Sequence, residues 1–424
     1  MAIAAHSAAK SSGHSPGENE RTGNTMDLLR SAERNAPHFI ELRRALHANA
    51  ESAFSERYAT ELVRRELNGL GITVLPNGDK TGVIGILEGA LPGKTVALRA
   101  EMDALAFCEE SGEPFAARNG NCHACGHDIH TAALLGAAAL LAERRSRLCG
   151  TVRFLFQPAE EGLRGAKTML ASGAMNDPVP DCIIAEHTWP DLPAGTVGYR
   201  YGAMMAASDR FYITIHAPGA HAAYPHKSAD PIVVMAAVIL QLQTVVSRET
   251  DPLAPAVVTV GRAEAGTAAN IIPTCARLEG TVRTFDPAVR DRIRLSIERI
   301  VRCTAEAMNA TAEVEYRPGS SPVINDENVL SAIVDAARTL LGTDKVIPLN
   351  APSMGGEDFS FYLETAPGAL FRIGTADERE ASRLALHNPR IVFNERAIIT
   401  GSAVMAGAAV LLTGSDRKLL TGEA

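Results

Sequence analysis

Two patterns of hydrophobic and polar positions divide the chain, and the first of them predicts an α/β domain. Apolar residues recur at helical spacing in some segments, whereas short continuous apolar runs bounded by turn residues indicate buried strands. Strands that alternate with helices predict a largely parallel sheet with helices on both faces. The predicted helices span 28–49, 56–70, 128–147 and 165–172, and the predicted strands span 83–87, 95–98, 151–156 and 181–185.

The second pattern occupies residues 201–317 and predicts a smaller α+β domain. Its segments follow the order strand, helix, strand, strand, helix, strand, which is typical of a two-layer sandwich. Because this region contains few candidate ligands, we interpret it as a lid domain inserted into the larger one. The predicted strands span 210–216, 256–264, 276–285 and 312–316, and the helices span 230–247 and 287–308.

The remaining segments complete the larger domain, which we expect to comprise residues 26–200 and 318–415. Its last helix, 397–412, is apolar but contains glycines, and we predict that it packs on the sheet instead of crossing a membrane. Residues 1–25 are rich in Ser, Gly, Ala and Asn and are expected to form a leader without fixed structure. Residues 416–424 are expected to form a tail.

Composition narrows the class of protein. A chain of 424 residues with 46% hydrophobic residues exceeds one typical core, so two domains are expected. The net charge of -8 and the lack of a basic block argue against a nucleic-acid partner, and no membrane partner is expected. Seven cysteines in so long a chain do not form a disulfide framework. Because no signal peptide is recognisable, we expect a cytoplasmic protein.

Three short segments carry residues suited to binding metal. Glu160 and Glu161 follow the apolar run 154–156, and two carboxylates that leave a buried strand need a partner such as a cation. Cys125 and His127 stand at a predicted helix start, and His187 follows the strand 181–185. Ligands collect at the carboxyl ends of parallel strands and the amino ends of helices. These side chains are therefore predicted to share one rim of the sheet.

The paired glutamates favour a metal-dependent hydrolase. Adjacent residues that leave a strand point in different directions, so one carboxylate can bind metal while the other serves as a base for water. Two alternatives remain open for the cysteine segment. Cys122 and Cys125 are spaced as a redox pair or half a zinc knuckle, although no second Cys-x-x-Cys completes such a site. The histidines at the helix start are also compatible with ordinary buried side chains.

Nine short motifs follow one another along residues 28–412. They are RRALH at 43–47, MDAL at 102–105, HACGHD at 123–128, QPAEE at 157–161, GAHAAYPH at 219–226, NIIP at 270–273, GTVR at 280–283, MGGEDF at 354–359 and LHNP at 386–389. In this order they resemble the aminoacylase and hippurate hydrolase family of dinuclear metallo-amidohydrolases, which includes the plant auxin-conjugate hydrolases. The resemblance implies a zinc-exopeptidase-like catalytic domain with an inserted lid and dimerisation domain.

The resemblance also implies a role for each matching position. It assigns the general base to Glu160 and the stabilisation of the oxyanion to His221, which reaches the partner subunit's site in a homodimer. Asp103 and Asp128 are implied to lie near the metals and to orient the ligands. The implied metal ligands are Cys125, His127, Glu161, His187 and His387, and the implied substrate-binding residues are Asn270, Arg283, Gly355 and Gly356.

The implied activity is hydrolysis of the amide bond of N-acyl amino acids by a water molecule activated by two divalent ions. Zinc suits the donor set, and the family also uses manganese or cobalt. Two rival functions remain. One is a dipeptidase or carboxypeptidase on the same centre, and the other is a non-catalytic metal-binding or redox-sensing protein.

Four positions depart from the family's usual pattern. Ala50 and Ala106 stand where the family has proline, and Glu101 stands where it has aspartate. Cys122 occupies a position that is usually apolar. We expect Glu101 to affect metal preference or pocket shape, and Cys122 is a candidate for oxidation with Cys125.

Overall fold

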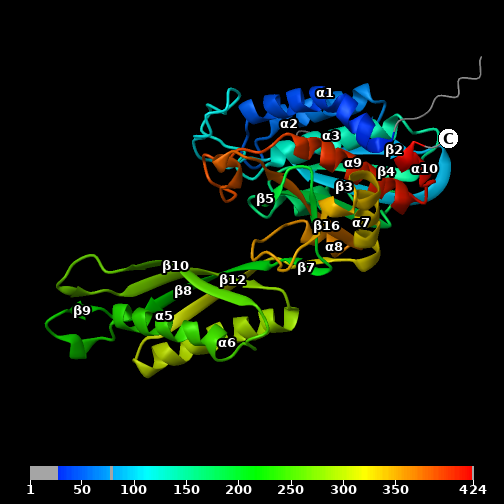
Figure 1. Ribbon diagram of the computed structural model, residues 1–424. Coiled ribbons are helices and arrows are strands. Elements are labelled where there is room, and N and C mark those ends of the chain that lie inside the picture. The colour runs from blue at the N-terminus through cyan, green and yellow to red at the C-terminus, as the bar shows by residue number, and fades with distance from the viewer. Residues whose placement is uncertain (1–26, 77–79, 423–424) are drawn as a thin grey trace, which may run out of the picture.

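The computed structural model describes residues 27–76 and 80–422 and has two domains (Figure 1). The leader expected at 1–25 lies outside the described residues. The strands of the larger domain's main sheet are β1 (Thr73–Val74), β2 (Val83–Glu88), β3 (Leu91–Glu101), β4 (Cys149–Gln157), β5 (Cys182–Pro193), β6 (Val197–Tyr199), β15 (Val346–Pro348) and β16 (Gly368–Ala376). Their order is β1-β2-β4-β3-β5-β16-β6-β15.

The middle of this sheet is parallel, from β4 through β3 and β5 to β16, while β2 and β6 join it antiparallel. The expected α/β class, a mostly parallel sheet covered by helices, is confirmed. One face packs against α2 (Arg57–Gly69), α3 (His127–Ala142), α7 (Glu327–Leu341) and α9 (Arg396–Thr413). Two further helices, α1 (Leu28–Ala48) and α10 (Lys418–Thr421), pack on these helices. The other face packs against α4 (Gly165–Ala171) and α8 (Ser360–Leu363).

The helix α9 is buried on the first of these faces. Among the described helices it is the one long and apolar enough to cross a membrane, yet 78% of it is buried inside the protein. It lies close to α3, where a Cβ at Gly136 would be 2.1 Å from the Ser402 hydroxyl oxygen. Its apolar surface is therefore core surface, as predicted.

The smaller domain is a four-stranded antiparallel sheet in the order β10-β12-β8-β13, covered on one face by two helices. Its elements are β8 (Ala207–His216), α5 (Pro231–Ser247), β10 (Ala256–Ala265), β12 (Cys275–Thr284), α6 (Pro287–Ala307) and β13 (Thr311–Ser320). Both helices begin with an aspartate whose carboxylate accepts a backbone N–H, followed by proline, as helix starts commonly do. The order of elements is the predicted one.

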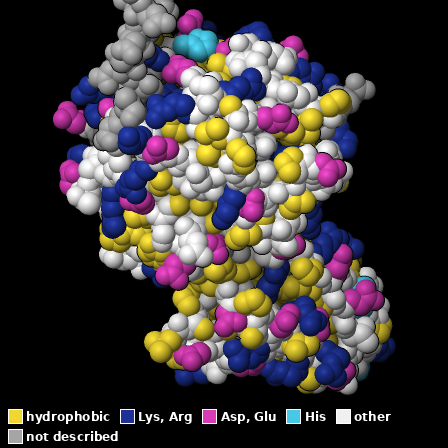
Figure 2. Space-filling model, turned by 90° about the vertical axis from the view of Figure 1, so that its right-hand side faces the viewer, with side chains coloured by type: hydrophobic (Ala, Val, Ile, Leu, Met, Phe, Trp, Pro, Cys, Tyr) yellow, Lys and Arg dark blue, Asp and Glu magenta, His cyan; other side chains and the backbone are white. Residues whose placement is uncertain are grey.

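Short pairings complete the chain path. The chain enters and leaves the smaller domain beside a two-stranded pair, β7 (Gly202–Met205) with β14 (Val323–Asn325). The other short elements are β9 (Ala220–His221), which pairs with β11 (Ile271–Ile272), and the 3₁₀ turns Pro225–Lys227, Thr343–Lys345 and Glu380–Arg383. Figure 2 shows the larger domain above the smaller one, with acidic and basic side chains interspersed on the face it draws.

Three predictions about the elements are corrected. The strand predicted at 181–185 continues to Pro193, because β16 pairs with it well beyond Ala185. His187 consequently lies inside β5 and not at its end. The helix expected to reach residue 147 ends at Ala142, after which the chain forms turns. The expected tail contains α10, whose Leu419 and Leu420 are buried against the larger core.

Candidate metal centre

A cavity of about 410 Å3 lies where the smaller domain meets the rim of the large sheet. Four of the five predicted metal ligands line it, together with the predicted base. The fifth predicted ligand, His127, is fully buried immediately behind them. The smaller domain contributes three lining residues from the sheet face opposite its helices: Ser208, Arg210 and Arg283.

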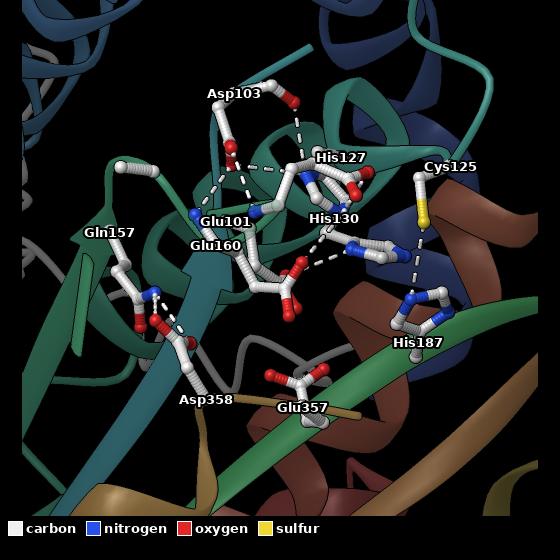
Figure 3. A network of polar contacts seen from close by, with 12 residues as sticks. Glu101, Asp103, Cys125, His127, His130, Gln157, Glu160, His187, Glu357 and Asp358 are labelled. Atoms are coloured by element: carbon white, nitrogen blue, oxygen red, sulfur yellow. Dashed lines mark hydrogen bonds and ion pairs between the residues drawn. The ribbon is translucent and has the colours of Figure 1, made fainter. Parts of the chain in front are cut away.

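The first group of candidate ligands comprises Cys125, His127 and His187. One ligand atom from each lies within 4.8 Å of the others, and the Cys125 sulfur is 3.5 Å from Nε2 of His187 (Figure 3). Gly126 permits the turn between Cys125 and α3, since its φ is 88° and a Cβ there would lie 2.6 Å from the Thr188 hydroxyl. The sequence therefore places a thiol and an imidazole on adjoining backbone at the helix start.

The second group comprises Cys125, Glu161 and His387, again within 4.8 Å of one another. Nε2 of His387 lies 3.5 Å from Oε1 of Glu161. His387 has a φ of 68°, and its backbone N–H donates to the carbonyl of Ala124 at 2.9 Å, which holds this loop beside the first group. Because Cys125 belongs to both groups, one sulfur is placed to serve two neighbouring cations.

Hydrogen bonds fix the orientation of the two buried imidazoles. Nδ1 of His127 donates to the carbonyl of Asp103 at 2.9 Å, and Nδ1 of His187 donates to the carbonyl of Thr188 at 2.8 Å. Both Nε2 atoms are thereby left as acceptors that face the cluster. His130 differs, because its Nδ1 bonds Glu101 at 2.9 Å and its Nε2 accepts from the Thr188 N–H at 2.8 Å. It has no nitrogen left for a cation.

The donor set fits divalent metal. Nε2 of His127 and Oε1 of Glu161 are buried and have no hydrogen-bond partner in the described part of the chain. Burial, with the charge of Glu161, also raises the pKa of the Cys125 thiol well above its usual range. A cation supplies the partner that these atoms lack, and a sulfur with imidazoles and a carboxylate suits a zinc-like ion.

A tight turn aims the two glutamates apart. The Asp103 carboxylate accepts the backbone N–H groups of Glu160 and Glu161, both at 3.0 Å (Figure 3). Ala159 has a φ of 53°, and its N–H donates to Glu56 at 2.9 Å. Glu161 thus points to His387, while Glu160 lies with Oε2 4.0 Å from Nε2 of His127.

Buried acids surround Glu160 on its other side. Burial, together with Glu357 and Asp358, raises the pKa of Glu160 well above its usual range. Figure 3 shows Glu357 facing it. Arg99 binds both neighbours, at 3.0 Å to Glu357 and 2.8 Å to Asp358. A carboxyl whose pKa is raised in this way is suited to proton transfer. Our sequence reasoning missed this group, although the adjacent acids stood within one of the motifs.

Predicted substrate-binding residues fall into two sets. Gly355, Gly356 and Arg283 line the cavity, and Arg283 donates through Nη1 to the Ser208 hydroxyl. His221 and Asn270 are exposed and do not line it. Figure 1 draws β9, which contains His221, at the end of the smaller domain away from the larger one. Within one chain, the structure does not bring either residue to the centre.

The cavity lining that was not predicted includes three large side chains, Arg210, Trp189 and Arg372. Hydrophobic patterning could not single out Trp189 or Arg372, because each lies within a buried strand of the central sheet. Arg210 was predicted only as part of a strand.

Asp128 has hydrogen-bond partners away from the candidate ligands. Its carboxylate accepts from Nε of Arg43 at 2.6 Å and bonds Nδ1 of His47 at 2.8 Å, and its side-chain hydrogen bonds among the described residues include no candidate ligand. It ties α1 to the start of α3. Glu101 pairs with Arg99 and His130 and is fully buried outside the cavity lining. Cys122 and Cys125 are both free thiols.

Comparisons with known proteins agree on one family. A family model described as peptidase family M20/M25/M40 matches residues 97–410. N-acetyl-L-cysteine deacetylase of Bacillus subtilis (strain 168) is 39% identical over 408 residues, which cover 94% of this chain and 95% of that protein. N-acyl-L-amino acid amidohydrolase of Geobacillus stearothermophilus is 44% identical over 288 residues, covering 68% and 77%.

A solved structure extends the likeness to the whole fold. A Bacillus subtilis protein described as a dinuclear metal binding peptidase from the M20 family superposes with a TM-score of 0.79 at 36% identity. The match covers 91% of this chain and 99% of that one.

Proposed function

The chain belongs to peptidase family M20/M25/M40 and is a metal-dependent amidohydrolase, and from this premise we propose that it cleaves the amide bond of N-acyl amino acids. The family and the class of metal-dependent amidohydrolase implied by the nine motifs are thereby confirmed. One arrangement supports this substrate class. The base Glu160 lies beside the two groups of candidate ligands, and Arg283 lies on the opposite wall of the same cavity. The names of the relatives given above support an acylated amino acid.

Five side chains would hold two divalent ions: Cys125, His127, Glu161, His187 and His387. When bound, the ions would activate water and polarise the amide carbonyl. We propose zinc, because thiolate and imidazole donors favour it, with manganese or cobalt as substitutes. The shared position of Cys125 supports a pair of neighbouring ions in place of one.

Glu160 accepts a proton from the attacking water and later returns it to the leaving nitrogen. Its burial beside Glu357 and Asp358 suits both steps, since a raised pKa lets the carboxyl hold the proton between them. Asp103 keeps the turn in place, so that Glu160 and Glu161 retain separate tasks. The described cavity lining offers no activated serine or lysine, and water attack without an acyl-enzyme is the route we propose.

Arg283 binds the substrate's α-carboxylate. Its guanidinium is half-buried, lies beside the Ser208 hydroxyl and forms no ion pair with any described carboxylate. Gly355 and Gly356 also line the cavity, and Gly356 packs closely on Ser208, because a Cβ there would lie 2.7 Å from that side chain. A charged group at this wall would hold the amide over the ligand cluster.

A homodimer is the assembly we propose. Helix α5 packs one apolar side against the sheet and has other apolar side chains exposed to solvent. The exposed fractions are 40% for Ile232, 55% for Val233 and 72% for Leu240. Continuous exposed apolar surface on a helix of this kind favours contact with another protein surface. A second copy covering α5 would also give His221 a site to enter, since its own chain's cavity does not include it.

The test is a substrate panel on metal-loaded enzyme. We expect N-acyl amino acids with a free α-carboxylate to be hydrolysed, and the same compounds amidated at that carboxylate to be poor substrates. Dipeptides with a free amino terminus form the comparison set. Faster cleavage of the dipeptides would contradict the proposal in favour of a peptidase, and no amide turnover with any metal would contradict hydrolysis altogether.

A further inference from the structure

Arg372 lies beside the candidate ligands by strand register. It belongs to β16, where it is paired in parallel with His187 of β5. Side chains at paired positions of neighbouring strands project from the same face of a sheet. The side chain of Arg372 therefore leaves the sheet on the same side as the imidazole of His187, and both residues line the cavity.

The guanidinium is buried without a counter-ion. Only 1% of Arg372 is exposed, and its guanidinium carbon lies 4.3 Å from the centre of the Trp189 ring. Nη2 donates to the Met205 sulfur at 2.6 Å, which is a weak acceptor, and Nη1 has no hydrogen-bond partner within the described residues. No ion pair joins Arg372 to a carboxylate in the described ranges. A buried, unpaired charge is costly to retain.

Two of the other fully buried arginines show what a structural role looks like in this protein. Arg99 pairs with Glu101, Glu357 and Asp358, and Arg153 donates to three backbone carbonyls. Glu357 also faces the cavity, but Arg99 already binds it at 3.0 Å. Arg372 thus lacks both kinds of partner, although it is a lining residue of the cavity.

The cavity therefore holds cations on two walls. Arg210 and Arg283 come from the smaller domain, and Arg372 comes from the larger one. If Arg283 holds the α-carboxylate, as proposed above, Arg372 is left to bind a second anion toward the other end of the substrate. Trp189 and Met205 beside it offer apolar contact to a short methylene chain.

We propose that Arg372 binds a carboxylate at the far end of the acyl group, so that the preferred substrates are amides of an amino acid with a short dicarboxylic acid. A succinyl group is one example. This inference rests on the proposed function, because it requires an N-acyl amino acid in the cavity. It assigns Arg372 to substrate selection, where the charge decides which acyl group is accepted.

The experiment compares two substrates that differ in one group. N-succinyl-alanine and N-butyryl-alanine have the same chain length, and only the first ends in a carboxylate. We expect kcat/KM of the natural enzyme to favour the succinyl compound by about tenfold to a hundredfold, the usual effect of a hydrogen bond to a charged group. Arg372→Met should bring that ratio close to one, and Arg372→Lys should keep part of it.

Arg338→Met is the matched control. Arg338 also stacks on an aromatic ring, that of Tyr199 at 5.9 Å, but lies outside the cavity lining. Its substitution should leave the ratio unchanged. Because the readout is a ratio, a loss of folded protein in any variant affects both substrates equally. Thermal unfolding of each variant is recorded alongside.

The outcomes separate this inference from the proposed function. Equal efficiency with both substrates in the natural enzyme would overturn the role of Arg372 and leave the amidohydrolase intact. A ratio that persists in Arg372→Met would overturn it as well. If the variant instead loses a preference for N-butyryl-aspartate over N-butyryl-alanine, the second anion lies on the amino-acid side, and the acyl assignment is wrong. No turnover of either substrate would overturn both proposals.

Discussion

The carboxylate of Asp103 holds the backbone of Glu160, with Oδ1 accepting its N–H at 3.0 Å. We predict that Asp103→Asn lowers kcat about tenfold to a hundredfold and weakens metal binding, because its amide group cannot accept both N–H bonds of the turn. Steady-state kinetics and metal titration measure the two effects. Asp181→Asn is the control, since Asp181 also accepts a backbone N–H, from Thr95 at 2.8 Å, outside the cavity. Equal losses in the two variants would contradict the prediction.

Replacement of the neighbouring glutamates should separate base from ligand. Glu160→Gln is expected to keep its metal and to lose about 10²–10⁴-fold in kcat, because an amide cannot carry the proton. Glu161→Gln is expected to lose metal, since Glu161 contacts His387 in the second ligand group. Metal content and kcat are measured on the same preparations. If metal is lost on changing residue 160 and retained on changing 161, the two roles are reversed.

Two buried cysteines that are close in sequence offer a contrast in metal content. Cys125 belongs to both ligand groups, so Cys125→Ala should lower occupancy from close to two ions per chain. Cys122 packs in the larger core, and Cys122→Ala should keep both ions at a cost of about 1 kcal/mol in stability. Elemental analysis of protein purified without chelator decides this. Full metal and activity in Cys125→Ala would show that its sulfur is not a ligand.

The buried imidazole of His47 should make stability depend on pH. Burial lowers the pKa of His47, but the charge of Asp128, with hydrogen bonds to Asp128 and Glu109, raises it overall above 6.5. The protonated form is therefore favoured in the folded state. The stabilisation of the folded state by protonated His47 is complete below the pKa that His47 has in the unfolded chain. It is lost as the pH rises through the higher pKa of the folded state.

We therefore predict that His47→Gln lowers the free energy of unfolding, and that the loss is largest at about pH 6. There it should amount to roughly 1–3 kcal/mol. The difference should shrink toward about pH 9. Urea unfolding at both values measures it. His38→Gln on the same helix is the control, because His38 is exposed and should show a small difference at either pH. A difference that grows with pH would reverse the sign of the prediction.

His221 should act in the neighbouring subunit. We expect inactive His221→Ala and inactive Glu160→Gln chains to regain activity when mixed and allowed to exchange, since one site of each mixed dimer then lacks both substitutions. A fluorescence label on each chain proves the exchange. Proven exchange without activity, or a fully active monomer, would place the function of His221 within its own chain or remove it.

Local patterns predicted most elements, because each reflects a face that its own residues bury. The order of elements in the smaller domain is one example, and the start of α3, predicted at residue 128 and observed at His127, is another. The full length of β5 could not be predicted from local patterns. Its C-terminal half pairs with β16, which lies far along the chain. The position of His187 was therefore misplaced by reasoning that used only neighbours in sequence.

The candidate site divides in the same way. Glu160, Glu161 and Cys125 stand in dense motifs and were identifiable from chemistry alone. His387 came only from the resemblance, since one histidine in a loop carries little signal of its own. Neither the chemistry of the motifs nor the resemblance identified Arg372. It lies in an apolar strand, and its interest comes from its pairing with His187 in the sheet. The metal's identity, the dimer and the cytoplasmic location stay predictions.

The place of β16 in the sheet bears on how the protein is synthesised. β16 comes from the C-terminal part of the chain yet lies between β5 and β6. As the chain leaves the ribosome, one edge of β5 stays unpaired until its parallel partner β16 has been synthesised. All four strands of the smaller sheet, in contrast, lie within residues 207–320. The inserted domain is thus the first able to close its core. Until residues 368–376 emerge, the nascent larger domain presents an unpaired strand edge, the kind of surface that chaperones protect from aggregation.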